Sequence, residues 1–315
     1  MKRIALTLGM LVAVVACDKA RAIDAASDAQ AANATESIDL SKQPEIVFQL
    51  FGERDDPRMI PIAAIVGGAL QPIELSDAGW HRFDAMYARA GTSYPLYRDG
   101  SLAGSASVRR GMWSAGEEPL YSLPGCSRLR PLSAVTLATA ATVGYTVEFL
   151  ATTPGLTPAI RPTVTPSPEL EAAAREAAHE TVRNAGLSEA DLDEKSFRYA
   201  AIRTGASESP TLVAWYLDLK VEGQVASTHV MVVSDRKDGG WEATYALTGA
   251  GPVGQREFRR YVDHLDVDGD GVDELLMEGW RFGGDTYPII LSLRVGKWTE
   301  VFHGRASWCL DPQAP

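Results

Sequence analysis

Residues 266–274 read DVDGDGVDE, and the apolar run LLM at 275–277 follows directly. Carboxylates stand at every second position over the first half of this stretch, and two glycines allow the chain to coil tightly between them. Hard cations such as Ca²⁺ take about six to eight oxygen ligands, which such a loop can supply. The stretch therefore predicts a cation-binding loop that joins a strand ending at Leu265 to a strand beginning at Val272.

The spacing of the acids distinguishes two kinds of calcium loop. An EF-hand has Asp at positions 1, 3 and 5, Gly at position 6 and a bidentate Glu at position 12. Counted from Asp266, the first four requirements are met, but position 12 is the apolar Met277, and the flanking segments have the composition of strands. The EF-hand is therefore excluded.

Acids at positions 1, 3, 5 and 9, followed at once by a strand, resemble the calcium loop of FG-GAP (integrin-alpha-like) and VCBS repeats. The resemblance implies a structural Ca²⁺ with five ligands, the side chains of Asp266, Asp268, Asp270 and Glu274 and the carbonyl of Val272. It also implies that Asp273 points towards water. The loop occurs once, which argues against a propeller, because each blade must pack on a neighbour. The other interpretation is a solvated turn that binds no ion.

The segment around this loop, 168–315, is predicted to be one α+β domain. Ser167 is a helix cap with Pro168 in the first turn, and the predicted helix runs to Asn184 before Gly186. On this helix His179 has no metal-ligand companion one turn later, so we interpret it as a surface residue. Strand-like segments follow at 196–204, 211–221, 229–234, 241–247, 258–265, 272–282, 286–293 and 297–302. We expect one helix packed on an antiparallel sheet.

A second, smaller β-rich α+β domain is predicted at 44–153. Its signals are strand runs at 46–51, 59–70 and 134–150, a short helix capped by Ser76 or Asp77, and a hairpin turn at Asp99-Gly100. The proline-rich segment 154–167 separates the two predicted domains, because repeated proline stiffens the chain and removes backbone donors. The predicted fold is thus α+β with two domains.

The start of the chain predicts its compartment. Residues 1–16 combine a basic head with an apolar run too short to span a membrane, which is typical of a signal peptide. The run ends in VVAC, which resembles the lipobox of bacterial lipoproteins and implies lipidation of Cys17. Residues 17–43 are polar and small, as in a flexible tether. We expect a lipid-anchored protein of the bacterial envelope, facing the periplasm or the exterior; an ordinary signal peptide is the alternative.

Charge and motif context exclude several functions. A formal net charge of −11 without a basic stripe argues against nucleic-acid binding. GAGPVG at 249–254 matches G-x-G-x-x-G, but its proline removes a backbone amide and the preceding strand belongs to a hairpin, so no nucleotide site is expected. SDRK at 234–237 has the S-x-x-K spacing without its partner motifs. The histidines lack zinc-binding spacing, and no catalytic set is evident, so an enzyme is the less favoured class.

Two cysteines, Cys126 and Cys309, remain after Cys17. In an oxidising envelope they are expected to form a disulfide, with two separately buried thiols as the alternative.

The favoured function is a calcium-stabilised binding or scaffold protein, anchored to the membrane and contacting a protein or glycan. One alternative is an envelope hydrolase acting on glycan or peptide between the domains. A carbohydrate-binding module is another, with an aromatic surface drawn from Trp80, Tyr87, Tyr94, Tyr97, Trp113 and Tyr121.

Overall fold

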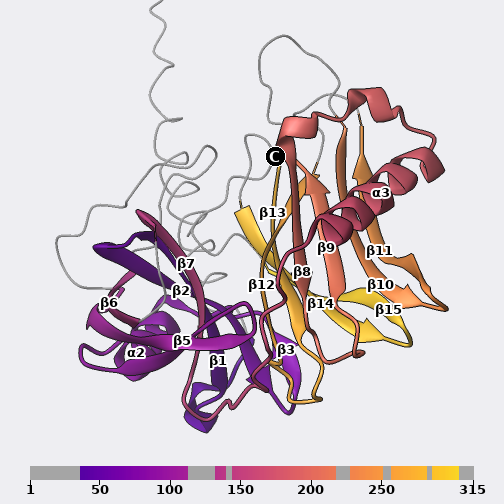
Figure 1. The fold of residues 1–315 in the computed structure, drawn as a ribbon. Coiled ribbons are helices and arrows are strands. Elements are labelled where there is room, and N and C mark those ends of the chain that lie inside the picture. The colour runs from indigo at the N-terminus through magenta and orange to yellow at the C-terminus, as the bar shows by residue number, and fades with distance from the viewer. Residues whose placement is uncertain are drawn as a thin grey trace, which may run out of the picture.

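The computed structural model of this chain describes residues 36–112, 132–139, 144–217, 228–250, 257–281 and 286–304. These residues form a mostly β structure with antiparallel sheets and two α-helices (Figure 1). The helices are α2 (Asp77–Tyr87) and α3 (Pro168–Asn184), with 3₁₀ turns η1 (Leu40–Lys42), η2 (Glu189–Asp191) and η3 (Glu194–Ser196). The strands are β1 (Glu45–Glu53), β2 (Asp56–Val66), β3 (Ala69–Gln71), β4 (Ser93–Arg98), β5 (Ser101–Arg110), β6 (Ser133–Thr139), β7 (Thr146–Thr152), β8 (Phe197–Ile202), β9 (Thr211–Tyr216), β10 (His229–Lys237), β11 (Gly240–Gly249), β12 (Glu257–Leu265), β13 (Glu274–Arg281), β14 (Thr286–Arg294) and β15 (Lys297–His303). No helix in the described ranges is long and apolar enough to cross a membrane.

The first sheet closes into a barrel. Its order is β1-β7-β4-β5-β6-β2-β3, and β1 also pairs with β2, so six of the seven strands form a ring and β3 adds to β2. The predicted strand at 46–51 is β1, the run 59–70 contains β2 and β3, and the run 134–150 contains β6 and β7. The closure itself pairs β1 with β7, about a hundred residues away, which no local strand signal specifies.

Helix α2 packs into the core of the barrel. The Ser76 hydroxyl accepts a hydrogen bond from the Gly79 amide at 3.1 Å, which confirms the predicted cap. The helix contributes Trp80, Phe83 and Tyr87 to the cluster formed by alternate residues of the barrel strands. Burial of the aromatic side chains Trp80, Tyr87, Tyr94 and Tyr97 argues against a sugar-binding surface made from them; Trp113 and Tyr121 lie outside the described residues.

The predicted hairpin turn at Asp99-Gly100 joins β4 to β5. Both residues have positive φ, 52° and 65°, as a two-residue type I′ turn requires. This local prediction is confirmed.

Two further four-stranded antiparallel sheets, β11-β10-β9-β8 and β12-β13-β14-β15, follow the proline-rich segment. Helix α3 covers one face of the β8–β11 sheet (Figure 1), where Ala174, Ala178 and Val182 pack on alternate residues of β9 and β10. The opposite face of the β8–β11 sheet packs on the β12–β15 sheet. The prediction of a helix packed on an antiparallel sheet is correct in outline, but the prediction of a single sheet is wrong, because the strands form two sheets. Near-continuous apolar runs in β10, β13 and β14 bury both faces of these strands, and two stacked sheets accommodate that burial.

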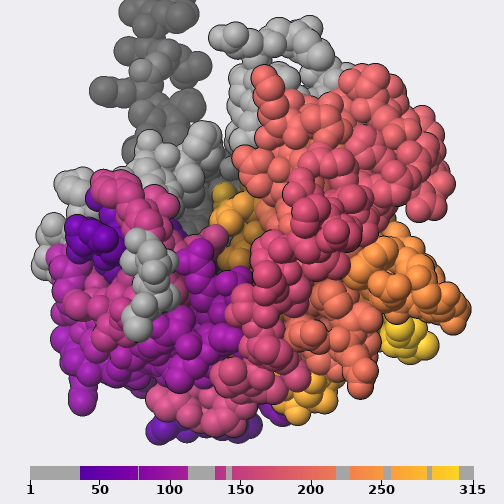
Figure 2. Space-filling view, viewed as in Figure 1, coloured from indigo at the N-terminus to yellow at the C-terminus, as the bar shows by residue number. Residues whose placement is uncertain are grey.

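The β12–β15 sheet also packs on the outside of the barrel. Leu276, Ile290 and Phe302 share an apolar cluster with Val47 and Leu150, among others. Figure 2 shows the indigo-to-magenta barrel lying directly against the later part of the chain. The layers therefore run from α3 through two sheets to the barrel, with apolar contacts at every step, and the predicted division into two domains at 154–167 stays a prediction.

Candidate metal centre

The acidic stretch forms the loop between β12 and β13, as predicted. Its carboxylates hold its own backbone: Asp266 accepts hydrogen bonds from the amides of Gly269 (2.9 Å) and Gly271 (3.2 Å). Asp268 accepts from the Asp270 amide at 3.1 Å. Gly269 and Gly271 have φ of 78° and 89°, a region that glycine enters without steric penalty. The loop therefore coils around its own carboxylates, which accept hydrogen bonds from its backbone amides.

Three carboxylates converge in the loop. Asp266, Asp268 and Glu274 each offer an oxygen within 4.8 Å of the others, and this set could hold a metal ion. Glu274 is fixed from both sides, because one oxygen accepts from the Val267 amide (3.0 Å) and the other from the Ser292 hydroxyl (2.8 Å). Buried, prearranged oxygens suit a hard cation.

The structure does not bring every predicted ligand into this set. Asp270 lies outside it, and one of its oxygens accepts from the Val272 amide at 2.8 Å. The Val272 side chain packs against the apolar cluster between the two sheets. Coordination by Asp270 and by the Val272 carbonyl therefore stays a prediction.

Burial dominates the electrostatics of the site. It raises the pKa of Glu274 to about 7, and the charges of Asp268 and Asp270 add to the increase. Burial also raises the pKa of Asp266. These shifts mean that the ionised carboxylates carry a cost, mainly of burial and in smaller part of mutual repulsion, which a bound cation would offset.

Arg294, at the end of β14, supplies positive charge to the loop. Its guanidinium lies 3.1 Å from Asp268 and 3.4 Å from Asp270, and the hydrogen bond to Asp268 is the main reason why its pKa is raised. The side chain is 48% exposed, so it can leave the loop without disturbing the core. Sequence reasoning missed Arg294, because only the pairing of β13 with β14 brings this distant position beside the loop.

The prediction that Asp273 points towards water is wrong. Asp273 is fully buried, its backbone amide donates to the Thr204 carbonyl at 2.7 Å, and its carboxylate accepts from Arg161 at 2.8 Å. Arg161 also donates to the Gly271 carbonyl. The loop runs between the proline-rich segment and the end of β8. Asp273, at position eight of the loop, therefore faces other protein groups instead of water. Burial raises the pKa of Asp273 to about 7, and Arg161 opposes this shift.

A second polar cluster lies beside the loop. Asp263 accepts from the Asp99 amide at 2.9 Å, and the Tyr261 hydroxyl lies 2.6 Å from Nδ1 of His264. Burial lowers the pKa of His264 to about 3, so this imidazole is neutral, and Tyr261 can donate to it. A cavity of about 360 Å³ reaches His264 between the proline-rich segment, β8 and the barrel hairpin.

Other candidate residues have different outcomes. Cys17, Cys126 and Cys309 lie outside the described residues, so lipidation and disulfide pairing stay predictions. The S-x-x-K match at 234–237 lies at the end of β10, beside a hairpin turn, as expected for an incidental motif.

Comparisons with models of protein families, with curated proteins and with solved structures find no match.

Proposed function

We propose that this protein is a lipid-anchored, extracytoplasmic binding or scaffold protein of the bacterial envelope, stabilised by a structural Ca²⁺ in the loop 266–274. The observation that carries the metal assignment is the convergence of Asp266, Asp268 and Glu274 within 4.8 Å. The resemblance of the loop to FG-GAP and VCBS calcium loops supports the same ion. All three ligands are carboxylates, which favours calcium over zinc, for which nitrogen and sulfur are the usual ligands.

A structural role fits the position of the loop better than a catalytic one. The loop connects two strands of the sheet that packs against both the barrel and the sheet under α3. A cation shared by Asp266, at the start of the loop, and Glu274, at the start of β13, would hold the ends of β12 and β13 together. Extracellular calcium modules bind the ion at about 10⁻⁴ to 10⁻³ M, so we expect an affinity in that range.

The envelope location is supported by the sequence. The short apolar run ending in VVAC indicates export and anchoring through Cys17, and the polar residues after it would serve as a tether. Calcium is available in such a compartment. The partner would be a protein or a glycan, with no role for nucleic acid or nucleotide.

The metal assignment is tested by thermal unfolding of chelator-treated protein with and without 5 mM Ca²⁺, a concentration of about ten times the middle of the expected range. We expect Ca²⁺ to raise the melting temperature by several degrees, since ligand binding stabilises the folded state by mass action. Asp268→Asn keeps the acceptor for the Asp270 amide but removes a charged ligand, and it should abolish the increase. Asp238→Asn, in the turn between β10 and β11, is the matched control. An equal calcium response in Asp268→Asn would contradict the proposal.

A hydrolase acting on glycan or peptide is the second candidate. The cavity beside His264 favours a hydrolase, because a histidine and an acid, Asp99, both line this cavity between the barrel hairpin and β8. If the protein hydrolyses glycan or peptide there, His264→Asn should abolish turnover of a cell-wall digest while His303→Asn retains it. Equal turnover in the two variants would reject this candidate.

A further inference from the structure

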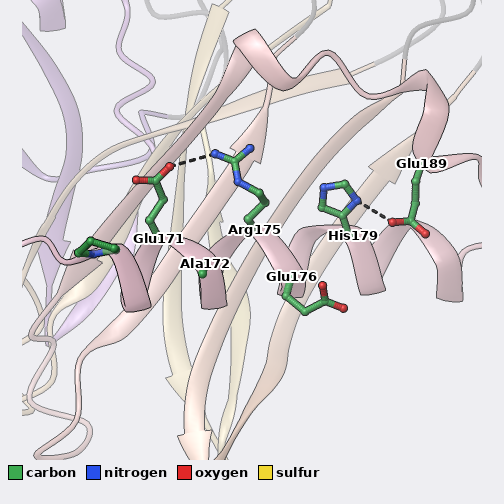
Figure 3. Close-up of a pocket in the computed structure, with 7 residues that line it drawn as sticks. Glu171, Ala172, Arg175, Glu176, His179 and Glu189 are labelled. Atoms are coloured by element: carbon green, nitrogen blue, oxygen red, sulfur yellow. Dashed lines mark hydrogen bonds and ion pairs between the residues drawn. The ribbon is translucent and has the colours of Figure 1, made fainter.

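His179, a partly buried residue of α3, bridges two carboxylates. Its Nδ1 lies 2.7 Å from Glu189 and its Nε2 lies 3.1 Å from Glu194. Glu189 belongs to η2 and Glu194 to η3, so one imidazole contacts both turns of the segment that returns from α3 to β8. In Figure 3 the imidazole and Glu189 face each other beside Arg175. These three residues help to line a shallow pocket of about 470 Å³.

The number of protons on the ring decides whether both contacts are favourable. A neutral imidazole has one N–H donor, whereas an imidazolium has two. An ionised carboxylate only accepts hydrogen bonds, so a ring nitrogen without a proton repels it. With carboxylates at both nitrogens, the arrangement matches the imidazolium.

A neighbouring hydroxyl allows a second hydrogen-bonding arrangement. The Tyr216 hydroxyl, on β9, lies 3.2 Å from Nε2 of His179 and 3.0 Å from both oxygens of Glu194. It can donate to Glu194 when the ring is charged, or to Nε2 when the ring is neutral. Burial, followed by the hydrogen bond to Glu194, raises the pKa of Tyr216 to about 12, so its proton is present at any physiological pH.

The remaining charged neighbours pair with one another around the two turns. Arg175 bonds Glu194 and also Glu171, at 3.0 Å. Arg183 bonds Glu189 at 3.0 Å and Glu176 at 2.6 Å. The pKa of Glu189 is lowered, first by its hydrogen bond with His179. Imidazole is the side-chain group that gains and loses a proton in the physiological pH range, and His179 is the imidazole among the described groups of this network.

We propose that His179 is a proton-operated latch that holds the segment 187–196 against α3 and β9. In the protonated state, Nδ1–H donates to Glu189 and Nε2–H donates to Glu194, while the Tyr216 hydroxyl also donates to Glu194. When the Nε2 proton leaves to solvent, the Tyr216 hydroxyl turns to Nε2, and Glu194 loses two donors while keeping Arg175. The turn η3 then loosens from the helix. This switch is independent of the metal site.

Hydrogen exchange of the full-length protein tests the latch. Exchange in 187–196, corrected for the intrinsic pH dependence, should be about threefold slower at pH 5.5 than at pH 8, a modest effect because the pairs are partly exposed and screened. His179→Gln cannot gain a proton and should remove the difference. His303→Gln is the matched control, since His303 contacts a single carboxylate, Glu300, at 2.6 Å, and it should keep the difference.

A second variant keeps the test decisive if His179→Gln does not fold. Glu194→Gln removes one carboxylate and leaves the contact with Glu189, so it should reduce the pH effect without abolishing it. Equal corrected exchange at the two pH values in the wild type, or an undiminished pH effect in either variant, would overturn the proposal.

Discussion

The Nε atom of Arg161 lies 2.8 Å from Oδ1 of Asp273, and this ion pair joins the proline-rich segment to the acidic loop. The same arginine is tied to the barrel: its amide donates to the Gly100 carbonyl at 3.0 Å, and its carbonyl accepts from the Ser101 hydroxyl at 2.6 Å. One residue therefore connects the barrel hairpin with the loop that was predicted to bind a cation.

Removal of this arginine should be strongly destabilising. Asp273 is fully buried, so Arg161→Met leaves an acid that must either ionise without its counter-charge or take up a proton, and at pH 8 we expect a loss of about 3 kcal/mol in the free energy of unfolding. Chemical denaturation measures it. Arg54→Met, which removes an exposed pair with Asp55, is the control and should change stability by less than about 1 kcal/mol. Similar losses in the two variants would contradict the role of Arg161 as a connection to the loop.

Gly100 should tolerate no side chain, for two separable reasons. Its φ is 65°, and an added Cβ would lie 2.7 Å from Nε2 of His264 and 3.1 Å from Oδ2 of Asp273. In Gly239, φ is 88° and no atom beyond the two adjoining residues lies within 4 Å of the added Cβ. Gly239→Ala therefore measures backbone strain alone, about 1 to 2 kcal/mol. Gly100→Ala should lose at least about 1 kcal/mol more in equilibrium unfolding, because packing clashes add to the strain. Equal losses would show that the hairpin is not seated against His264.

Arg294 should weaken metal binding, because it occupies the same carboxylates. Arg294→Gln removes a positive charge that lies 3.1 Å from Asp268 and should lower the dissociation constant for Ca²⁺ about fivefold, the effect of an exposed pair worth about 1 kcal/mol. Isothermal titration calorimetry measures the constant. Arg281→Gln, an exposed arginine at the end of the adjacent strand β13, is the control and should leave it unchanged. Weaker calcium binding in Arg294→Gln would mean that the arginine supports the ion instead of competing with it.

Lipidation of Cys17 should decide where the protein partitions. The wild-type chain should enter the detergent phase of a Triton X-114 extraction of expressing cells, and Cys17→Ser should leave that phase or remain unprocessed, because the acyl chains supply the membrane affinity. Cys126→Ser, which leaves the anchor sequence intact, should partition like the wild type. Unchanged partitioning and processing of Cys17→Ser would remove the basis for the anchor.

The parts of the fold that were predictable are those specified within a few residues. The Ser167 hydroxyl caps α3 by accepting from the Leu170 amide at 3.3 Å, and Asp99-Gly100 forms a turn because both residues tolerate positive φ. In the acidic loop, three of the four predicted carboxylate ligands converge for the same reason, since they are close in the chain and the glycines fix its path.

Other features required contacts between distant segments. Nothing near Asp273 indicates that Arg161, more than a hundred residues earlier, lies against it, or that Arg294 lies beside Asp268. His179 was interpreted as a surface residue from its lack of a partner along the helix, yet its partners come from the turns after it and from β9. Local sequence specifies caps, turns and the coil of the acidic loop, because neighbouring residues satisfy one another there. Barrel closure, the second sheet and the charge partners of the loop were decided only by tertiary packing, because burial pairs groups that are far apart in sequence.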